Sequence, residues 1–267
     1  MSVAFHSVVS APPSGRGRGL ILDHHDYAQA VILQGKLVPW DDVTRYTRFL
    51  GQAQGLLRPD TTLLDLGAFY AHAIGADPAL VAAMSARSRT GYALKTLLAH
   101  EATQAAALEF ASVVAQSARQ PLVAQVPSPL RWLATTHRLA GAGDIGDITA
   151  DHGENMAVYV ADWLRRFATL PVSLLLLDGR RADLPGLPAE DLGRYSPIGN
   201  AAEHYRWTLG CRRDGGIEVA GGVTGVAVPA EFWLADGVEV PAGDFLVAEI
   251  PAAAEPETVL KKLAELG

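Results

Sequence analysis

The hydrophobic pattern of the chain changes its character at about residue 118. Before that point apolar residues recur mostly at helical spacing. One helix is expected to open at Pro39-Trp40-Asp41-Asp42 and to bury Val43, Tyr46 and Phe49. A long Ala-rich helix is expected after Thr90, running to about residue 118. The pattern therefore predicts a mainly helical N-terminal third.

Strands and helices alternate in the remainder of the chain. Strands are expected at 122–126, 172–177, 207–212, 223–228 and 244–250. Helices are expected at 129–139, 151–167, 198–205 and 256–266. Two further short apolar runs, at 19–22 and 62–66, could supply early strands within the helical third. This order is typical of an α/β fold with a parallel sheet.

The chain length suits one domain with a large core. A (β/α)8 TIM barrel needs about 250 residues, and this chain has 267. We therefore expect residues 1–267 to form a single barrel-like domain, complete or degenerate, with residues 1–19 as a flexible lead-in. The stretch Ser10–Gly19, rich in Pro, Gly and Ser, is typical of a loop.

Composition and charge exclude several classes of partner. The net charge of −7 and the pI of about 5.6 disfavour a nucleic-acid-binding protein. No apolar run reaches the roughly 18–20 residues of a membrane span, and Met1–Leu20 has no secretory pattern. A single cysteine, Cys211, excludes an internal disulfide and suits a reducing cytoplasm. The match to G-x-G-x-x-G at 141–146 follows a helix, so no cofactor is predicted.

The most informative stretch is an apolar run that ends in Asp178-Gly179-Arg180. Residues 172–177 are apolar apart from Ser173, which is typical of a strand buried on both faces. Ligands of such sheets collect where strands end. Burial should raise the pKa of Asp178, whereas Arg180 should oppose that shift. We predict Asp178 as an acid–base or substrate-orienting group and Arg180 as an anion clamp.

Other polar side chains also follow expected strands. Gln125 and Ser128 flank the end of the strand at 122–126, where they could hydrogen-bond a ligand, and Arg131 could hold a carboxylate. His204 and Tyr205, on the helix at 198–205, are candidates for an auxiliary proton-transfer pair.

A second cluster favours a different chemistry. Asp23, His24 and His25 follow the apolar triplet 20–22, and His72 follows the run at 62–66. Imidazoles flanked by carboxylates can bind a divalent metal. An exposed turn leading into a helix is the alternative interpretation of the same residues.

From Gln120 to the C-terminus the chain resembles the barrel superfamily that includes cobalamin-independent methionine synthase and uroporphyrinogen decarboxylase. The resemblance lies in Pro121–Leu130, the helix and strand ending at Asp178, Trp207–Cys211, and Phe245–Leu266. Position 209 is Leu where the synthases carry a metal-binding His, and the acidic motif is Asp-Gly-Arg instead of Asp-Glu-Pro. The resemblance thus implies the metal-free chemistry of the superfamily, with Asp178 at the substrate cleft.

The sequence therefore predicts a metal-independent enzyme of the cytoplasm. Its expected reaction is that of a lyase, decarboxylation or C–C cleavage, on a small and anionic organic substrate. The alternatives are a divalent-metal hydrolase or lyase built on Asp23, His24 and His25, and a non-catalytic partner subunit with a degenerate barrel. A homo-oligomer is compatible with each of these hypotheses.

Overall fold

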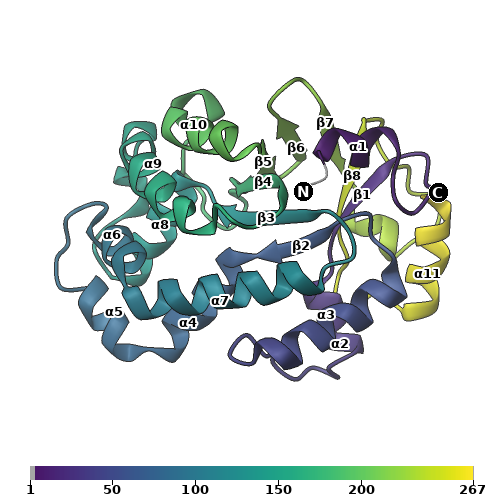
Figure 1. Ribbon diagram of the computed structural model, residues 1–267, viewed down its shortest axis with the longest axis horizontal. Helices are drawn as coiled ribbons and strands as arrows, with labels where there is room; N and C mark the ends of the chain where they lie inside the picture. Colours follow the sequence, from purple (N-terminus) through teal and green to yellow (C-terminus); the bar gives the residue numbers. More distant parts are fainter. Residues whose placement is uncertain (1–3, 267) are drawn as a thin grey trace.

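The computed structural model describes residues 4–266, which form one mixed α/β fold around a curved sheet (Figure 1). The strands are β1 Gly19–Asp23, β2 Thr62–Asp65, β3 Leu122–Pro127, β4 Val172–Asp178, β5 Thr208–Arg213, β6 Gly216–Val219, β7 Thr224–Ala227 and β8 Phe245–Glu249. The longer helices are α3 Val43–Leu57, α4 Leu66–Ala76, α7 Glu101–Ser117, α8 Pro129–Leu139, α9 Ala150–Leu164, α10 Ser196–Tyr205 and α11 Pro256–Glu265. The shorter helices are α1 Phe5–Ser10, α2 His25–Val31, α5 Pro78–Met84 and α6 Tyr92–Ala99.

Over residues 4–266 the sheet has eight strands in the order β1-β8-β7-β6-β5-β4-β3-β2. Seven of them run in one direction, while β6 pairs antiparallel with both β5 and β7. The two edge strands, β1 and β2, contact each other, so the sheet curls into a nearly closed barrel. The expected barrel shape is thus confirmed, and the β5–β6–β7 hairpins depart from a regular strand–helix repeat.

The seam between β1 and β2 is held by the buried side chain of Asp60. Its carboxylate accepts hydrogen bonds from the amides of Leu20 (2.9 Å) and Ser14 (2.7 Å) and forms an ion pair with Arg16 (3.3 Å). The Asp60 amide in turn donates to the Leu20 carbonyl at 3.0 Å. A single carboxylate therefore joins the two sheet edges and the loop that leads to β1.

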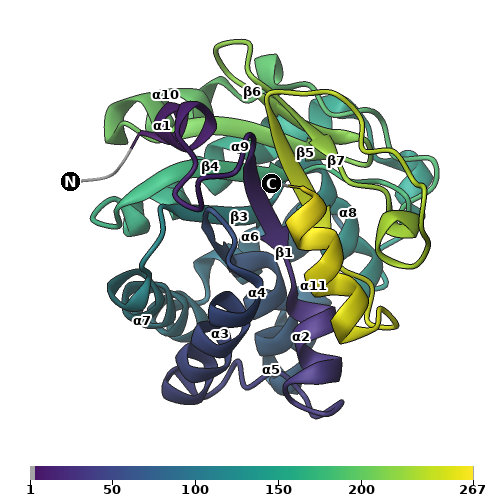
Figure 2. The same cartoon turned by 90° about the vertical axis from the view of Figure 1, so that its right-hand side faces the viewer.

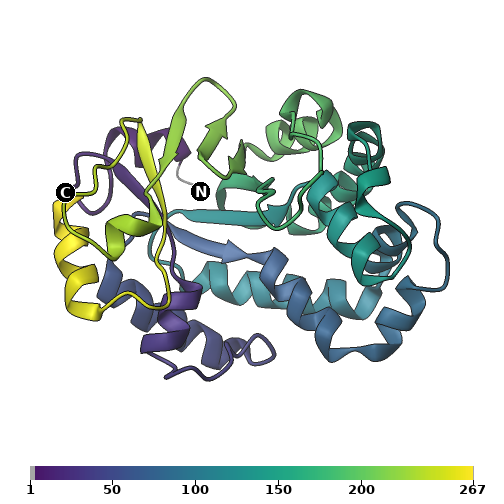
Figure 3. The ribbon, with the colours of Figure 1, turned by 180° about the vertical axis from the view of Figure 1, so that it is seen from behind.

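The N-terminal segment differs from the flexible lead-in that the sequence predicts. Phe5 and Val8 of α1 are buried beneath the barrel, and the Phe5 ring meets the Phe245 ring edge-on at 5.2 Å between centroids. Figure 2 shows β1 beside β8 and α11, so the first and last segments of the chain lie together. Seen from behind, this group lies at one end of the molecule, and α4, α5 and α6 lie at the other (Figure 3).

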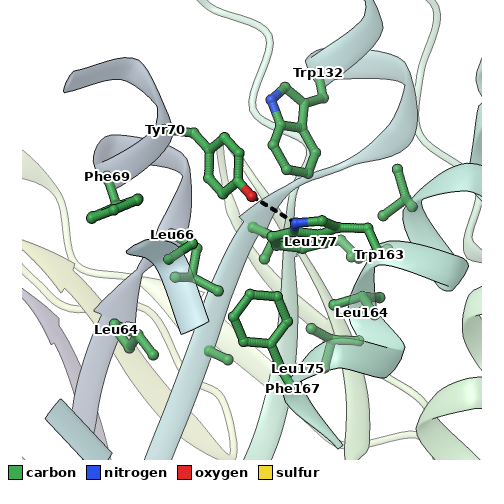
Figure 4. Close-up of a cluster of buried hydrophobic side chains, with 14 of the residues drawn as sticks. Leu64, Leu66, Phe69, Tyr70, Trp132, Trp163, Leu164, Phe167, Leu175 and Leu177 are labelled. Carbon is green, nitrogen blue, oxygen red and sulfur yellow. Dashed lines mark hydrogen bonds between the residues drawn. The ribbon is translucent and has the colours of Figure 1, made fainter. Parts of the chain in front are cut away.

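Most of the remaining helices pack on the outer face of the sheet. The largest core cluster joins outward side chains of β2, β3 and β4 to α4, α8 and α9. In this cluster the Trp163 indole donates a hydrogen bond to the Tyr70 hydroxyl at 2.7 Å, and Trp132 packs edge-on to both rings (Figure 4). Each polar atom of the buried Tyr70–Trp163 pair therefore has a partner, as burial requires.

Several predicted elements are confirmed within one or two residues, among them α8, α11, β3 and β4. The prediction of one long helix after Thr90 is wrong, because the helix is interrupted at His100, which separates α6 from α7. His100 takes an extended conformation, and its Nδ1 lies 2.8 Å from the hydroxyl of Thr103. Strand β6 was not predicted. No helix within residues 4–266 is both long and apolar enough to span a membrane.

Candidate functional site

The interior of the barrel consists of an apolar floor and a polar upper layer. Side chains alternate between the two faces of a strand, and the inward ones form a separate cluster: Ile21, Leu63, Val123, Leu174, Leu176, Ile217, Val219, Phe245 and Val247. On β1, β2, β3, β4, β5 and β8, a polar residue lies two positions after an inward one, near the carboxyl end of the strand, and this residue also points inward. These residues are Asp23, Asp65, Gln125, Asp178, Arg212 and Glu249. The polar upper layer therefore follows from strand periodicity and strand length.

Arg212 is the centre of this polar layer. Its guanidinium is buried and donates through Nη1 to Asp23 (2.9 Å) and Gln125 (3.0 Å) and through Nη2 to Glu249 (3.0 Å). The Gln125 amide then donates to Asp65 Oδ2 at 2.9 Å. One arginine thus connects the ends of β1, β3 and β8, and through Gln125 that of β2.

Asp178 lies where the sequence predicts it, buried at the end of β4 and paired with Arg180. The guanidinium binds both carboxylate oxygens, at 2.9 and 2.8 Å, and Arg131 Nε lies 3.8 Å away. Burial alone would raise the pKa of Asp178, but the hydrogen bonds and charges of Arg180 and Arg131 lower it below its usual value. Asp178 is therefore ionised at neutral pH and binds the Arg180 guanidinium through both carboxylate oxygens.

Gln125, Ser128 and Arg131 are occupied by contacts within the protein. The amide of Gln125 has partners at both ends, and Arg131 forms a two-point ion pair with Asp183. Ser128 caps α8 by accepting from the Arg131 amide and donates to the buried carboxyl of Glu190. These contacts hold the three side chains in place, and the ligand contacts expected of them from the sequence stay a prediction.

Asp23 also holds an imidazole. The Nδ1 of His25 lies 3.3 Å from Asp23 Oδ1, and its Nε2 lies 2.8 Å from the Tyr46 hydroxyl. Burial opposes a charge on His25, but the bond to Asp23 and the nearby carboxylates raise its pKa above the usual value. Burial and the adjacent His25 lower the pKa of His24 to about 4. The two neighbouring histidines are thus in opposite electrostatic environments.

Asp65 is a carboxyl of the upper layer whose surroundings favour its protonated form. Burial, and next the charge of Asp23, raise its pKa, despite the opposing charge of His25 and the hydrogen bond from the Ala68 amide. Its side chain is only partly covered. A carboxyl with a raised pKa can act as a general acid in proton transfer.

A cavity of about 330 Å³ opens beside this layer, at the carboxyl ends of β5, β7 and β8. Its charged lining consists of Asp26, Arg180, Arg212, Arg213, Asp214 and Glu249, and its apolar lining includes Val228, Val247, Ile250 and Pro251. This volume is typical of a site for a small ligand. A more open hollow of about 1380 Å³ lies at the opposite, amino ends of β1 to β3 and contains none of the predicted site residues.

Two predicted groups are not brought to this mouth. His204 and Tyr205 end α10 just before β5 begins, so they lie at the amino ends of the strands. His72 lies on α4, apart from Asp23, His24 and His25 at the end of β1. Among residues 4–266 no three His, Cys, Asp or Glu side chains are arranged to hold a metal ion.

The zinc pair of the resembling synthases has no counterpart in the geometry either. Leu209 belongs to the outer apolar core, and burial raises the pKa of the Cys211 thiol to about 12. Cys211 packs near Gly179, where an added Cβ would lie 3.0 Å from its sulfur. This environment is that of an inert thiol.

The sequence interpretation missed Arg212, Glu249 and Asp65 as site residues. Each lies at the end of a strand that the sequence suggests. The rule used for Asp178, that ligands collect where strands end, therefore also applies to these three residues. Glu190 and Tyr195 were missed as well; they lie in the loop after β4 and hydrogen-bond each other beside Ser128. No periodic signal marks these two residues.

Comparisons with protein-family models, curated proteins and solved structures find no match to this chain.

Proposed function

We propose that the chain is a small-molecule enzyme whose active site lies at the carboxyl ends of the barrel strands. Its reaction is that of a lyase, decarboxylation or C–C cleavage, on a small anionic organic substrate. This proposal includes a relation to the metal-free side of the methionine synthase and uroporphyrinogen decarboxylase superfamily. The observation that carries it is the layer of six inward polar side chains beside the 330 Å³ cavity.

The arginines of the cavity would bind the anionic substrate. Arg180 and Arg212 both line the cavity, and each is held by a carboxylate that is largely covered, Asp178 or Asp23. A guanidinium held in this way presents its free N–H groups to a substrate carboxylate without a further ordering cost. It would also stabilise negative charge that develops when a C–C bond breaks.

Asp65 would transfer the proton. Decarboxylation leaves an electron pair on carbon, which must be protonated, and a carboxyl with a raised pKa can supply that proton. Gln125 holds Asp65 and Arg212 in a fixed relation by bonding both. In this scheme Asp178 and Asp23 orient the arginines and stay ionised.

The proposal is tested by following the loss of small carboxylic acids by NMR in the presence of the protein. For an acid that wild type converts, Asp65→Asn should lower kcat by about 100-fold or more, the range of general acid–base catalysis. His204→Gln, at the opposite end of the barrel, is the matched control and should leave turnover unchanged. Unchanged turnover in a folded Asp178→Asn variant would remove the site, as would the absence of conversion across the panel.

A further inference from the structure

One carboxylate oxygen, Oε2 of Glu249, is shared by the two arginines of the cavity. It lies 2.6 Å from Nη1 of Arg180 and 3.0 Å from Nη2 of Arg212. The Glu249 side chain is 49% exposed, whereas that of Arg212 is 6% exposed. A half-exposed acid therefore occupies a position between two guanidinium groups that other side chains hold in place.

The arginines do not depend on Glu249 for their orientation. Arg180 is held by the two oxygens of Asp178, and Arg212 by Asp23 and Gln125. If the Glu249 carboxylate moves into solvent, both guanidinium groups stay in place with free N–H donors. The Glu249 side chain is already half in solvent, so water can replace the hydrogen bonds that its carboxylate gives up in this movement.

The surroundings of Glu249 would suit the rest of a ligand. The same cavity is lined by Val247, Ile250 and Pro251 on the β8 side and by Arg213 on the other. A short apolar part of the ligand would pack against the three residues on the β8 side. A second negative group of the ligand would reach Arg213. The occupant for which the geometry is already shown is a carboxylate, since Glu249 itself provides one.

We propose that Arg180 and Arg212 form a carboxylate clamp that Glu249 occupies in the free protein, and that a ligand carboxylate binds by displacing Glu249. This inference names the charged group of the substrate in the proposed function and rests on that function for its biological role. The binding step itself requires no turnover. Glu249 is then an internal competitor of the ligand.

Internal competition has a measurable consequence. The apparent Kd of a ligand equals its intrinsic Kd divided by the fraction of molecules in the binding-competent state, here the state in which Glu249 has left the arginines. If Glu249 leaves the clamp free about one-tenth of the time, its removal tightens ligand binding about tenfold. Glu249→Gln should therefore bind carboxylates more tightly than wild type, although an ion pair has been lost.

Removal of any acid from the cavity also increases the attraction for anions. Asp214 provides the matched control, because it lines the same cavity and carries the same charge but bonds the Arg181 amide instead of the clamp. Asp214→Asn should change affinity by less than about threefold, since its field at the cavity is screened by solvent. Arg180→Gln should weaken binding at least tenfold.

The experiment is isothermal titration calorimetry with succinate, acetate and inorganic phosphate at constant ionic strength set by chloride. A roughly tenfold gain in Glu249→Gln for succinate and acetate, absent in Asp214→Asn, supports the clamp. An equal gain in both variants, no gain, or a loss overturns it. Tighter binding of phosphate than of either carboxylate overturns the assignment of the ligand group.

Two further arms keep the test decisive. If Glu249→Gln does not fold, Glu249→Asp shortens the side chain by one methylene and should also bind succinate more tightly than wild type. The clamp and the proposed function fail separately. Tighter succinate binding without any lyase turnover removes only the function, and turnover without the Glu249 effect removes only the clamp.

Discussion

Arg212 donates a hydrogen bond to Asp23 at 2.9 Å, although the two residues are 189 positions apart in the sequence. Asp23 ends β1 and Arg212 lies at the end of β5, and three strands separate β1 from β5 in the sheet order. The contact therefore crosses the mouth of the barrel, and the curvature of the sheet makes it possible. It joins the buried arginine to the carboxylate that also holds His25.

Arg212→Ala should lower the free energy of unfolding by about 3 kcal/mol or more. Removal of one partner of a buried ion pair leaves the other charge uncompensated, which costs about 3–5 kcal/mol. The neighbouring Arg213, whose ion pair with Glu218 is about half exposed, is the control. Arg213→Ala should cost no more than about 1 kcal/mol. Urea unfolding followed by circular dichroism measures both, and equal losses would contradict a central role for Arg212.

The sheet itself could be predicted to a large extent from the sequence. β4 is buried along its whole length, so its apolar run alone identifies it. β1 and β2 are short, and only a brief apolar run suggests each of them. β6 escapes detection because its four residues, Gly216–Val219, include two buried and one exposed position and carry too little pattern.

The site could be predicted only in part. Asp178 and Arg180 follow from the rule that polar residues at strand ends form the site. The bonds of Arg212 to Asp23 and Gln125 cross the barrel, and no local pattern encodes them. His204 shows the converse, because a helix that precedes a parallel strand ends at the amino end of the sheet, and His204 therefore lies at the end opposite Asp178. Strand direction, and not proximity in sequence, decides which residues meet.

Asp178 should contribute to stability in a way that depends on pH. Its pKa in the folded protein lies below the ordinary value of about 3.9. The contribution is therefore present above pH of about 4 and is lost as pH falls through the lower, folded pKa. The stability difference between wild type and Asp178→Asn should shrink as pH falls from 7 to below 4. Unfolding curves of both proteins across this range measure it, and parallel pH profiles would contradict the shift.

His24 and His25 should titrate far apart although they are neighbours. NMR of the ring protons should give a pKa of about 4 for His24 and a value above the usual 6.5 for His25. Because the pKa of His25 is raised on folding, its stabilising effect is complete below about pH 6.5 and is lost as pH rises through the folded pKa. Signals are assigned with His24→Gln and His25→Gln, and coincident titrations would contradict the Asp23–His25 contact.

Phe5→Ala should destabilise the barrel even though Phe5 lies almost at the beginning of the chain. Its ring is 2% exposed and closes the apolar floor against Phe245, so truncation leaves a cavity among inward side chains. Loss of a buried Phe costs about 3–5 kcal/mol. His6→Ala, on the exposed face of the same helix, should change the free energy of unfolding by no more than about 0.5 kcal/mol. Denaturant titration of the two variants measures both changes in the free energy of unfolding. If the N-terminal segment were a flexible lead-in and not a packed helix, both changes would be small.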